Sequence, residues 1–512
     1  MYSAISFFVV LILIGVPLWW KTTEVYRFSL PYSQIDVLHE HKLTIQMNIH
    51  VMTIDNSRGT AIVEDLKKFF QISKIFNITF KQHTVDKQLL GSCKTLAEIE
   101  NKIKHPSYVG SLQLIEIPGL SRFVPYSIVL GEKRTIYFAS NVDVVKLYDF
   151  INTKVLNEDV LVDTTLEINL PVQSKLNKNS RHKISLSESF DILFTILNPD
   201  PDLLDVTFDI QKAIEDFVTP FKSDLNDMYE FHIKSQWLYY VDLQVQTKFL
   251  NFTDKGPHFA LPADLLPHVI TPLEKKLASH VSKYPCLNFI LYIPPCATSP
   301  LFIYTKNGFK LEGANAFISP KWGGIQIYNH NRNFCSDGKK VEVNIDSNYV
   351  MSVYLAQFRL LLGMPDIAEV QDTKNLNKVR LWEKDSLLRL RTVEQLTFTK
   401  LTLQSLSKLL GKINNIVIND QVGHAIYSAL DNVYEASEAL GKGDLLTGYN
   451  LSKKAFLASE KAFTDPSLLS LLYFPDDQKY AVYIPLFLPI MIPVLISIKP
   501  ILQWLNLKLK EK

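Results

Sequence analysis

The sequence predicts a mixed α/β fold: a mixed sheet flanked by helices, then a small helical bundle, anchored by an N-terminal and a C-terminal transmembrane helix. Short apolar or alternating runs interleave with helical segments in the first two thirds of the chain, which is typical of a sheet with helical cover. From Trp382 onward, apolar residues recur every three or four positions, as in packed helices. Each end of the chain carries an uncharged run of 18 residues, about the length that crosses a bilayer.

The composition is that of a folded protein without a nucleic-acid-binding surface. The chain has 512 residues, of which 47% are hydrophobic, and this is ample for two or three domains. Its 54 basic and 52 acidic residues leave a net charge of +2 without a long basic block, which argues against a nucleic-acid partner. Four cysteines in a chain of this length are too few for a disulfide scaffold.

The N-terminal uncharged run is Ser3–Trp20, which ends in two tryptophans followed by Lys21. Tryptophan is enriched at membrane interfaces, so Trp19 and Trp20 are expected at the headgroup level. The alternative is a cleaved signal peptide, but no basic segment precedes the run and no small-x-small cleavage site precedes Trp19. We therefore expect an uncleaved anchor.

The C-terminal uncharged run is Ala481–Ile498, between Lys479 and Lys499. Prolines recur in it at intervals of four, at Pro485, Pro489 and Pro493. An interior proline costs about 3 kcal/mol in a soluble helix, but membrane helices tolerate it where neighbours satisfy the freed carbonyls. The pattern predicts a kinked span packed among partner helices, and the alternative is a proline-rich pair of buried strands. The flanking basic residues do not decide which side the enclosed chain faces.

Strands dominate the first two thirds of the chain. Leu43–Val51 alternates apolar and polar residues without a fault, as a half-buried strand does. Leu287–Ile293 is almost wholly apolar, as a strand covered on both faces is. Further strands are expected at Leu112–Ile117, Thr135–Phe138, Ile192–Leu197, Leu204–Phe208, Trp237–Val241, Leu301–Tyr304, Gly324–Tyr328 and Val341–Ile345.

Helical spacing lies between these strands and continues alone toward the C-terminus. Helices are expected at Ala61–Lys74, Val142–Val155, Ile210–Phe221, Leu265–Val281 and Tyr349–Leu362. In the last third, apolar residues step by three or four within residues 390–410, 422–440 and 451–462. This predicts two or three antiparallel helices that lead to the C-terminal run.

The sequence carries no catalytic signature. It has no Gly-x-Ser-x-Gly elbow, no phosphate-binding glycine-rich loop and no His-Glu-x-x-His. His39-Glu40-His41 is predicted to be a solvated turn, because on an extended chain the two histidines share a face while Glu40 points away. We therefore predict no catalytic residue, no metal ligand and no cofactor site.

Cysteines and sequons are the candidate sites of covalent modification. Cys286 and Cys296 flank Leu287–Ile293, and a strand of that length separates them by more than about 20 Å, which argues against a disulfide between them. Cys296 with Cys335 is a candidate pair in an oxidising lumen. Candidate N-glycosylation sites are Asn77, Asn251 and Asn450, although sequons also arise by chance in a chain of this composition.

Seven stretches, in this order from about Gly15 to Pro493, resemble the PIG-S family. They are GVPLWWKTTEVYRFSLPYSQI, SLSESFDILFTILNPDPD, LPHVITPLE, YPCLNFILYIP, NAFISPKWGGIQIYN, LLGKINNIVI and SEKAFTDPSLLSLLYFPDDQKYAVYIPLFLP. The last motif is highly specific on its own. The resemblance implies a non-catalytic subunit of the GPI transamidase, which cleaves a C-terminal signal from a proprotein and joins the new carboxyl end to a GPI anchor.

The resemblance also implies partners and a location. The expected partners are the caspase-like PIG-K, which carries the Cys-His chemistry, together with PIG-T, PIG-U, GPAA and membrane lipid. The expected location is the endoplasmic reticulum membrane, with two spans, a large lumenal domain and both termini cytosolic. Rival interpretations are a membrane-anchored hydrolase with an unrecognised site, using Cys296 or Cys335, and a lipid- or substrate-binding subunit.

With this topology the sequence divides into six predicted parts. They are a transmembrane helix at 1–21, two lumenal α/β parts at 22–180 and 181–365, a lumenal helical segment at 366–479, a second transmembrane helix at 480–498 and a cytosolic tail at 499–512.

Overall fold

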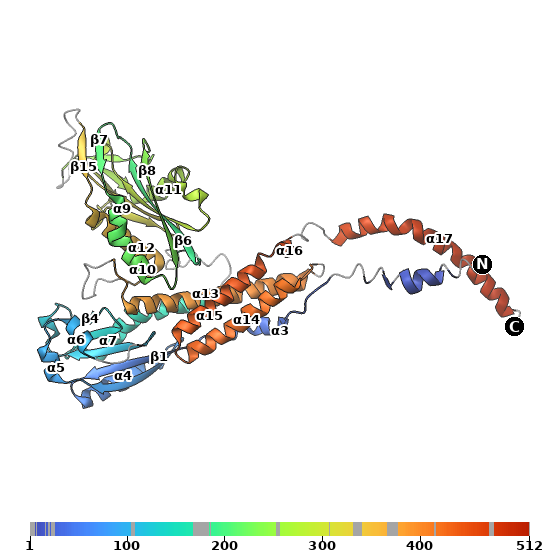
Figure 1. Ribbon diagram of the computed structural model, residues 1–512, viewed down its shortest axis with the longest axis horizontal. Helices are drawn as coiled ribbons and strands as arrows, with labels where there is room; N and C mark the ends of the chain where they lie inside the picture. Colours follow the sequence, from blue (N-terminus) through green and yellow to red (C-terminus); the bar gives the residue numbers. More distant parts are fainter. Residues whose placement is uncertain are drawn as a thin grey trace. The chain divides into compact units, whose positions relative to one another are not determined.

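The structure is a computed structural model of the full chain (Figure 1). It describes residues 6, 8–15, 17–18, 21, 26–103, 108–166, 184, 186–251, 256–306, 308–330, 340–365, 377–413, 416–469 and 476–510. The chain divides into two units. Unit 1 comprises residues 1–42, 395–436 and 450–512, and unit 2 comprises residues 43–394 and 437–449. The domain bounds predicted from the sequence stay predictions.

The first sheet of unit 2 has the order β2-β1-β3-β5-β4. All neighbouring pairs are parallel except β4 with β5, which is antiparallel. The strands are β1 (Ile45–Thr53), β2 (Phe76–Thr84), β3 (Leu112–Ile117), β4 (Ile128–Leu130) and β5 (Thr135–Ala139). All six residues of β3 are buried, because it lies inside the sheet and is covered on both faces.

Helices cover this sheet because each turns one apolar stripe toward it. α4 (Asn56–Phe70) begins at Asp55, whose side chain accepts a hydrogen bond from the Ser57 N–H, and it buries Ile62 and Leu66 among others. The other helical segments are α5 (Lys87–Ser92), α6 (Leu96–Lys102), α7 (Val144–Phe150), η3 (Ile151–Leu156) and α8 (Glu158–Leu166).

The second sheet of unit 2 has the same topology as the first. Its order is β8-β6-β11-β14-β13, and again only the last pair is antiparallel. The strands are β6 (Ser189–Asn198), β8 (Glu230–Tyr239), β11 (Cys286–Tyr292), β13 (Ala316–Ser319) and β14 (Gly323–Ile327). In both sheets the chain starts at the second position, moves to the first, crosses to the third and ends with an antiparallel hairpin at the far edge. Unit 2 therefore contains two repeats of one topology, one built on each sheet.

The helices of the second sheet follow the same plan. α9 (Ile210–Ala213), η6 (Ile214–Val218) and α10 (Thr219–Asp224) follow β6 as α4 follows β1. α12 (Ser347–Leu362) follows the hairpin and packs on α9 and η6, as α7 packs on α4. The insertions of this half are α11 (Leu266–Glu274), the pair β7 (Leu204–Thr207) and β15 (Val341–Asn344), and a small sheet of β9 (Lys248–Leu250), β10 (His258–Pro262) and β12 (Leu301–Tyr304).

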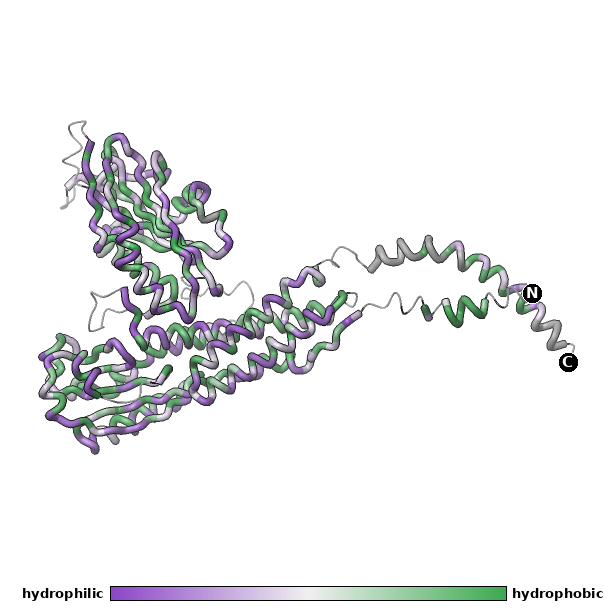
Figure 2. The backbone as a smooth tube through the Cα atoms, viewed as in Figure 1, coloured by the Kyte–Doolittle hydropathy of each residue, from purple (hydrophilic) through white to green (hydrophobic). Residues whose placement is uncertain are grey.

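Long helices follow the second sheet. α13 (Leu381–Lys412) belongs to unit 2 up to Glu394 and to unit 1 from Gln395. α14 (Asp420–Gly441) and α15 (Leu445–Phe463) bury the apolar stripes that the sequence predicts, and Figure 2 shows hydrophobic and hydrophilic residues alternating along them. Smaller helices in unit 1 are α3 (Tyr32–Val37) and α16 (Pro466–Leu469).

The predicted transmembrane helices are wrong, although the mixed α/β fold is as expected. Among the described residues, no helix combines the length and the apolar character that crossing a membrane requires. In the N-terminal run the π-helix η1 (Leu11–Gly15) has only five residues, against the roughly 20 that a span needs. α17 (Asp476–Lys510) has 35 residues, but Lys499 and four prolines lie inside it.

Candidate functional site

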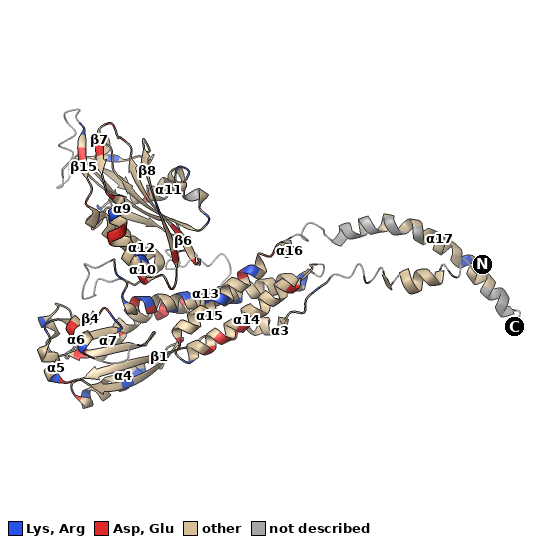
Figure 3. Cartoon of the chain, viewed as in Figure 1, with Lys and Arg blue, Asp and Glu red and all other residues tan. Residues whose placement is uncertain are grey.

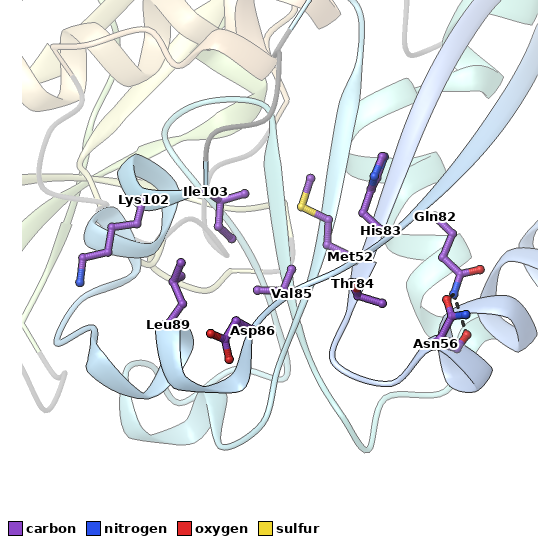
Figure 4. Close-up of a pocket in the computed structure, with 10 residues that line it drawn as sticks. All are labelled: Met52, Asn56, Gln82, His83, Thr84, Val85, Asp86, Leu89, Lys102 and Ile103. Carbon is purple, nitrogen blue, oxygen red and sulfur yellow. Dashed lines mark hydrogen bonds between the residues drawn. The ribbon is translucent and has the colours of Figure 1, made fainter.

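An open hollow of about 690 Å³ lies at the carboxyl ends of β1 and β2 (Figure 4). Its lining comes from the strand ends and from the helices that start or finish beside them: Met52, Asn56, Gln82, His83, Thr84, Val85, Asp86, Leu89, Lys102 and Ile103. In open α/β sheets, ligands bind outside the carboxyl ends of the strands, close to the strand where the chain reverses direction. β1 is that strand in the first sheet, so its position makes this hollow a candidate binding site.

The amides of Asn56 and Gln82 form one wall of the hollow. Gln82 Nε2 donates to the Asn56 carbonyl at 2.6 Å and to Asn56 Oδ1 at 2.7 Å (Figure 4). Its Oε1 accepts from Thr60 Oγ1 at 3.1 Å. Gly59 permits this close approach, because a Cβ there would lie 2.4 Å from Gln82 Nε2. The amide of Gln82 therefore fastens β2 to the first turn of α4.

Two histidines stack beside this wall. His50 of β1 is 6% exposed, and its Nδ1 lies 3.0 Å from Nε2 of His83 on β2. The two rings stack with centroids 5.2 Å apart. A hydrogen bond between two imidazoles requires one of them to accept through an unprotonated nitrogen, so the pair cannot be doubly protonated with this contact intact.

The charged residues of the hollow already have partners. Asp86 caps α5 by accepting from the Gln88 N–H at 2.9 Å, and Lys102 Nζ donates to Ser92 Oγ at 3.3 Å. Toward the third strand, Arg58 of α4 pairs with Glu116 of β3 at 2.8 Å and donates to the Ser140 carbonyl. These contacts hold the strand ends and the neighbouring helices together at the hollow, and they form no nucleophile–base pair. Among the described residues, no group of three or more His, Cys, Asp or Glu side chains is placed to hold a metal ion.

The free cysteines among the described residues, Cys93 and Cys286, have the surroundings of structural thiols. Cys93 is buried and donates to the Leu89 carbonyl at 3.2 Å. Cys286 opens β11, and burial, followed by the nearby Asp191 carboxylate, raises the pKa of its thiol to about 11. Asp191 pairs with Lys234 at 2.6 Å and also accepts from Ser282. A thiol with so high a pKa is almost entirely protonated at neutral pH and is a poor nucleophile.

Alkylation of Cys286 by iodoacetamide at pH 7.5 should be roughly 30-fold slower than that of glutathione. The small thiolate fraction lowers the rate, and the greater intrinsic nucleophilicity of a high-pKa thiolate offsets part of the loss. Mass spectrometry of the Cys286 peptide over time measures the rate, with Cys286→Ser identifying the signal. The rate should climb until about pH 11. A rate equal to that of glutathione at pH 7.5 would show an activated thiol.

The predicted disulfide involves one described residue. Cys296 begins the short helix η9 (Cys296–Thr298) and is disulfide-bonded. Cys335 lies outside the described residues, so its pairing with Cys296 stays a prediction.

The other predicted sites are exposed and do not come together. Asn77 lies in the edge strand β2, Asn251 directly after β9 and Asn450 in α15, and all three are exposed. The prolines lie exposed within α17, and their role in helix packing stays a prediction: Pro485, Pro489 and Pro493. The His39-Glu40-His41 stretch leaves α3 in a turn, as expected for the first two residues, but His41 is partly buried and its ring packs edge-on against Tyr434.

Sequence reasoning missed the buried charges on the first half of α13. Figure 3 shows residues of both signs along this helix. Its acidic residues pair with buried arginines in three ion pairs: Glu383 with Arg359, Asp385 with Arg134, and Glu394 with Arg391. Arg134 comes from the first repeat and Arg359 from the second, so α13 is held by both halves of unit 2. The signal in the sequence is the motif RLWEKDSLLRLRTVEQL, in which charged residues of both signs stand among the apolar ones.

Comparisons with known proteins agree with the motifs quoted above. The family model described as "Phosphatidylinositol-glycan biosynthesis class S protein" matches residues 6–508. The GPI-anchor transamidase component PIGS of Bos taurus is 38% identical, over 97% of this chain and 94% of that protein. The human protein of the same name is 37% identical, over 97% and 94%. The GPI transamidase component PIG-S homolog of Schizosaccharomyces pombe is 25% identical, over 97% and 82%. The chain is a member of the PIG-S family.

Proposed function

We propose that the chain is a subunit of the GPI transamidase that supports the attachment of GPI anchors without taking part in the chemical step. The observation that carries this proposal is the similarity to GPI-anchor transamidase components along nearly the whole chain. The geometry of unit 2 supports the non-catalytic part. Beside the hollow Arg58 and Glu116 form an ion pair with each other, and burial raises the pKa of the Cys286 thiol to about 11.

The build of unit 2 suits a scaffold. Unit 2 consists of two α/β halves with the same topology. Each half forms a buried ion pair with the same helix, α13. A buried pair holds its elements in one arrangement, because separating the charges leaves them unpaired in a low-dielectric interior. Such a framework can hold several partner chains in fixed positions.

The partners and the compartment belong to the same proposal. A caspase-like subunit, PIG-K, would supply the cysteine and histidine that cleave the proprotein, and PIG-T, PIG-U and GPAA would complete the complex. We place the chain in the endoplasmic reticulum, with unit 2 in the lumen, where a disulfide at Cys296 is compatible with the redox conditions.

Replacement of each cysteine by serine tests the non-catalytic role. Cells that lack the chain are supplied with the wild-type chain, Cys93→Ser, Cys286→Ser, Cys296→Ser or Cys335→Ser, and a GPI-anchored reporter at the cell surface is measured. We expect every variant to restore the reporter in proportion to the amount of folded chain and of recovered complex. A variant that is abundant and assembled but restores no reporter would mean that its thiol acts in the reaction.

Glycosylation tests the lumenal placement. Asn251 lies in irregular chain after β9, whereas Asn77 lies within a strand and Asn450 within a helix. Sequons in exposed loops accept glycans most readily, so Asn251→Gln should remove the largest endoglycosidase-sensitive shift in electrophoretic mobility. Asn77→Gln and Asn450→Gln are the matched controls. No glycan on the wild-type chain at any of the three would count against a lumenal unit 2.

A further inference from the structure

The first repeat of unit 2 shows how this topology accommodates an additional helix. The start of α13 lies against the turn of the β4–β5 hairpin: the Leu381 N–H donates to the Glu132 carbonyl at 3.1 Å, and the Trp382 N–H donates to the Lys133 carbonyl at 3.2 Å. Trp382 is 1% exposed, and its Nε1 donates to the Gly131 carbonyl at 3.0 Å.

Further along, the same helix lies beside the segment that follows the hairpin. Arg389 Nη2 donates to the Val155 carbonyl of η3 at 3.2 Å. An added helix thus fills the place between the edge hairpin and the helical segment that follows it.

The corresponding place in the second repeat is an open groove of about 710 Å³ between the edge strand β13 and α12. On the side of β13 it is lined by Ala316, Phe317 and Ile318 of the strand and by Ala314 just before it. On α12 it is lined by Val353, Ala356 and Leu360, at helical spacing. Ala356 is exposed and Leu360 is 52% exposed. None of the residues that line the groove is ionisable.

The wall of the groove contains an unsatisfied polar group. Gln357 lines the groove and is 5% exposed. Its Nε2 donates to the Phe317 carbonyl at 3.2 Å, which fixes the orientation of the amide. Its Oε1 is buried and has no hydrogen-bond partner among the described residues, a state that destabilises the fold until a donor reaches it. It is held in place over Gly324, where a Cβ would lie 2.2 Å from it.

We infer that this groove binds an α-helix of another subunit of the complex, laid between β13 and α12 as α13 is laid in the first repeat. The inference rests on the proposed function, because it needs a partner chain. The helix presents an uncharged face, since the groove offers no ionisable group. One large side chain fills the space above Ala316 and Ala356, and a donor on it, such as the N–H of a tryptophan, satisfies Gln357 Oε1 after a small movement of the glutamine. Trp382 is the precedent within the chain.

Photo-cross-linking in the intact complex tests this inference. A benzophenone amino acid is placed at Ala356 or Leu360 of the full chain, and at Asn348 as the control, which is exposed on α12 but does not line the groove. After purification and irradiation, mass spectrometry identifies the linked peptide. We expect both groove positions to link to one stoichiometric subunit, at residues three or four apart as on a helix. Asn348 should give no such product.

Filling the groove with a large side chain gives a second test, read as recovery of the linked subunit. Ala356→Trp should reduce recovery of the linked subunit about tenfold, whereas Asn348→Trp should leave it unchanged, and thermal unfolding of both variants shows that they are folded.

The inference fails if the complex is recovered but the groove positions give no cross-link beyond the control. It also fails if the linked residues are two apart, as on a strand, or belong to a second copy of this chain. A chain purified without any transamidase subunit would instead contradict the proposed function itself.

Discussion

Replacing Asp385 by alanine should lower the free energy of unfolding of unit 2 by about 3–5 kcal/mol. Asp385 accepts from Arg134 Nε at 2.5 Å and from Arg134 Nη2 at 2.9 Å, and both side chains are buried. It also accepts from the Gly110 N–H at 2.8 Å. Burial lowers the pKa of Arg389 to about 10 and Asp385 opposes this shift, so the substitution leaves two buried guanidinium groups without their nearest carboxylate.

Two controls separate this effect from a general loss of charge. Asp227→Ala removes an exposed partner of Lys384, one residue from Asp385, and should change stability by less than about 1 kcal/mol. Arg134→Met combined with Asp385→Leu replaces the pair by apolar groups and should recover most of the loss. Urea unfolding of the purified chain measures all three. If Asp385→Ala stays within about 1 kcal/mol of the wild type, the pair does not hold α13.

Replacing Lys400 by methionine should stabilise unit 1 by about 2 kcal/mol at pH 7. Lys400 lies in α13, is 6% exposed and donates to the His41 carbonyl at 2.9 Å. Burial lowers the pKa of its amine to about 8, which corresponds to a cost of about 3 kcal/mol for the charged form. The methionine variant avoids this cost but loses the hydrogen bond to His41, which lowers its expected gain in stability by about 1 kcal/mol.

The pH dependence identifies the cause. Below pH 8, Lys400 is charged in the folded and the unfolded chain, and the cost is present in full. Between pH 8 and 10.5 the folded chain loses the proton while the unfolded chain keeps it, so the wild type gains stability relative to the methionine variant as pH rises. Above about pH 10.5 the cost of the charge is gone and only the lost hydrogen bond to His41 remains, so the wild type should be the more stable by about 1 kcal/mol.

Measurements between pH 7 and 11 avoid the other titratable group that faces this amine. His41 has a pKa lowered by burial and by Lys400 and therefore titrates below this range. Lys408→Met is the matched control, because Lys408 is exposed on the same helix. Thermal unfolding at each pH compares the variants. A difference between Lys400→Met and the wild type that does not change with pH would show that packing, rather than charge, is responsible.

The periodicity of the sequence predicts most core elements of unit 2. β3 coincides with the predicted strand Leu112–Ile117, and β11 lies one residue from the predicted Leu287–Ile293. These strands are buried on both faces, so apolar residues dominate them, although β3 also carries Gln113 and Glu116. β2 (Phe76–Thr84) was not predicted: it is a half-exposed edge strand, and the alternation of Phe76, Ile78 and Phe80 is short and gives way to polar residues. Nor can periodicity show the repeat, because topology depends on long-range strand pairing.

Sequence patterns predict the candidate sites less well, for an identifiable reason. The stripe from Leu390 to Leu410 predicts a helix, and α13 is that helix. The periodicity says nothing about its charged residues, and Asp385 bonds an arginine 251 residues earlier in the chain. The groove beside β13 is also invisible in the sequence, because small residues such as Ala316 and Ala356 carry no signal until the fold brings them together.

The transmembrane helices were predicted from the uncharged length of the two runs, the Trp19–Trp20 pair and the proline pattern. In the part of the chain that the structure describes, the N-terminal run contains the five-residue π-helix η1, and four prolines and Lys499 lie within α17. The uncharged composition of the two runs therefore suggested membrane spans that the described helices do not form.

Affinity purification of the tagged chain in a mild detergent, followed by quantitative mass spectrometry, tests the proposed scaffold role most directly. We expect a caspase-like subunit and the other transamidase components to be recovered in stoichiometric amounts with the wild-type chain and with Cys286→Ser. Asp385→Ala should reduce that recovery in parallel with its loss of folded chain. A folded wild-type chain that is recovered alone, or with unrelated proteins, would contradict a role as a subunit of the GPI transamidase.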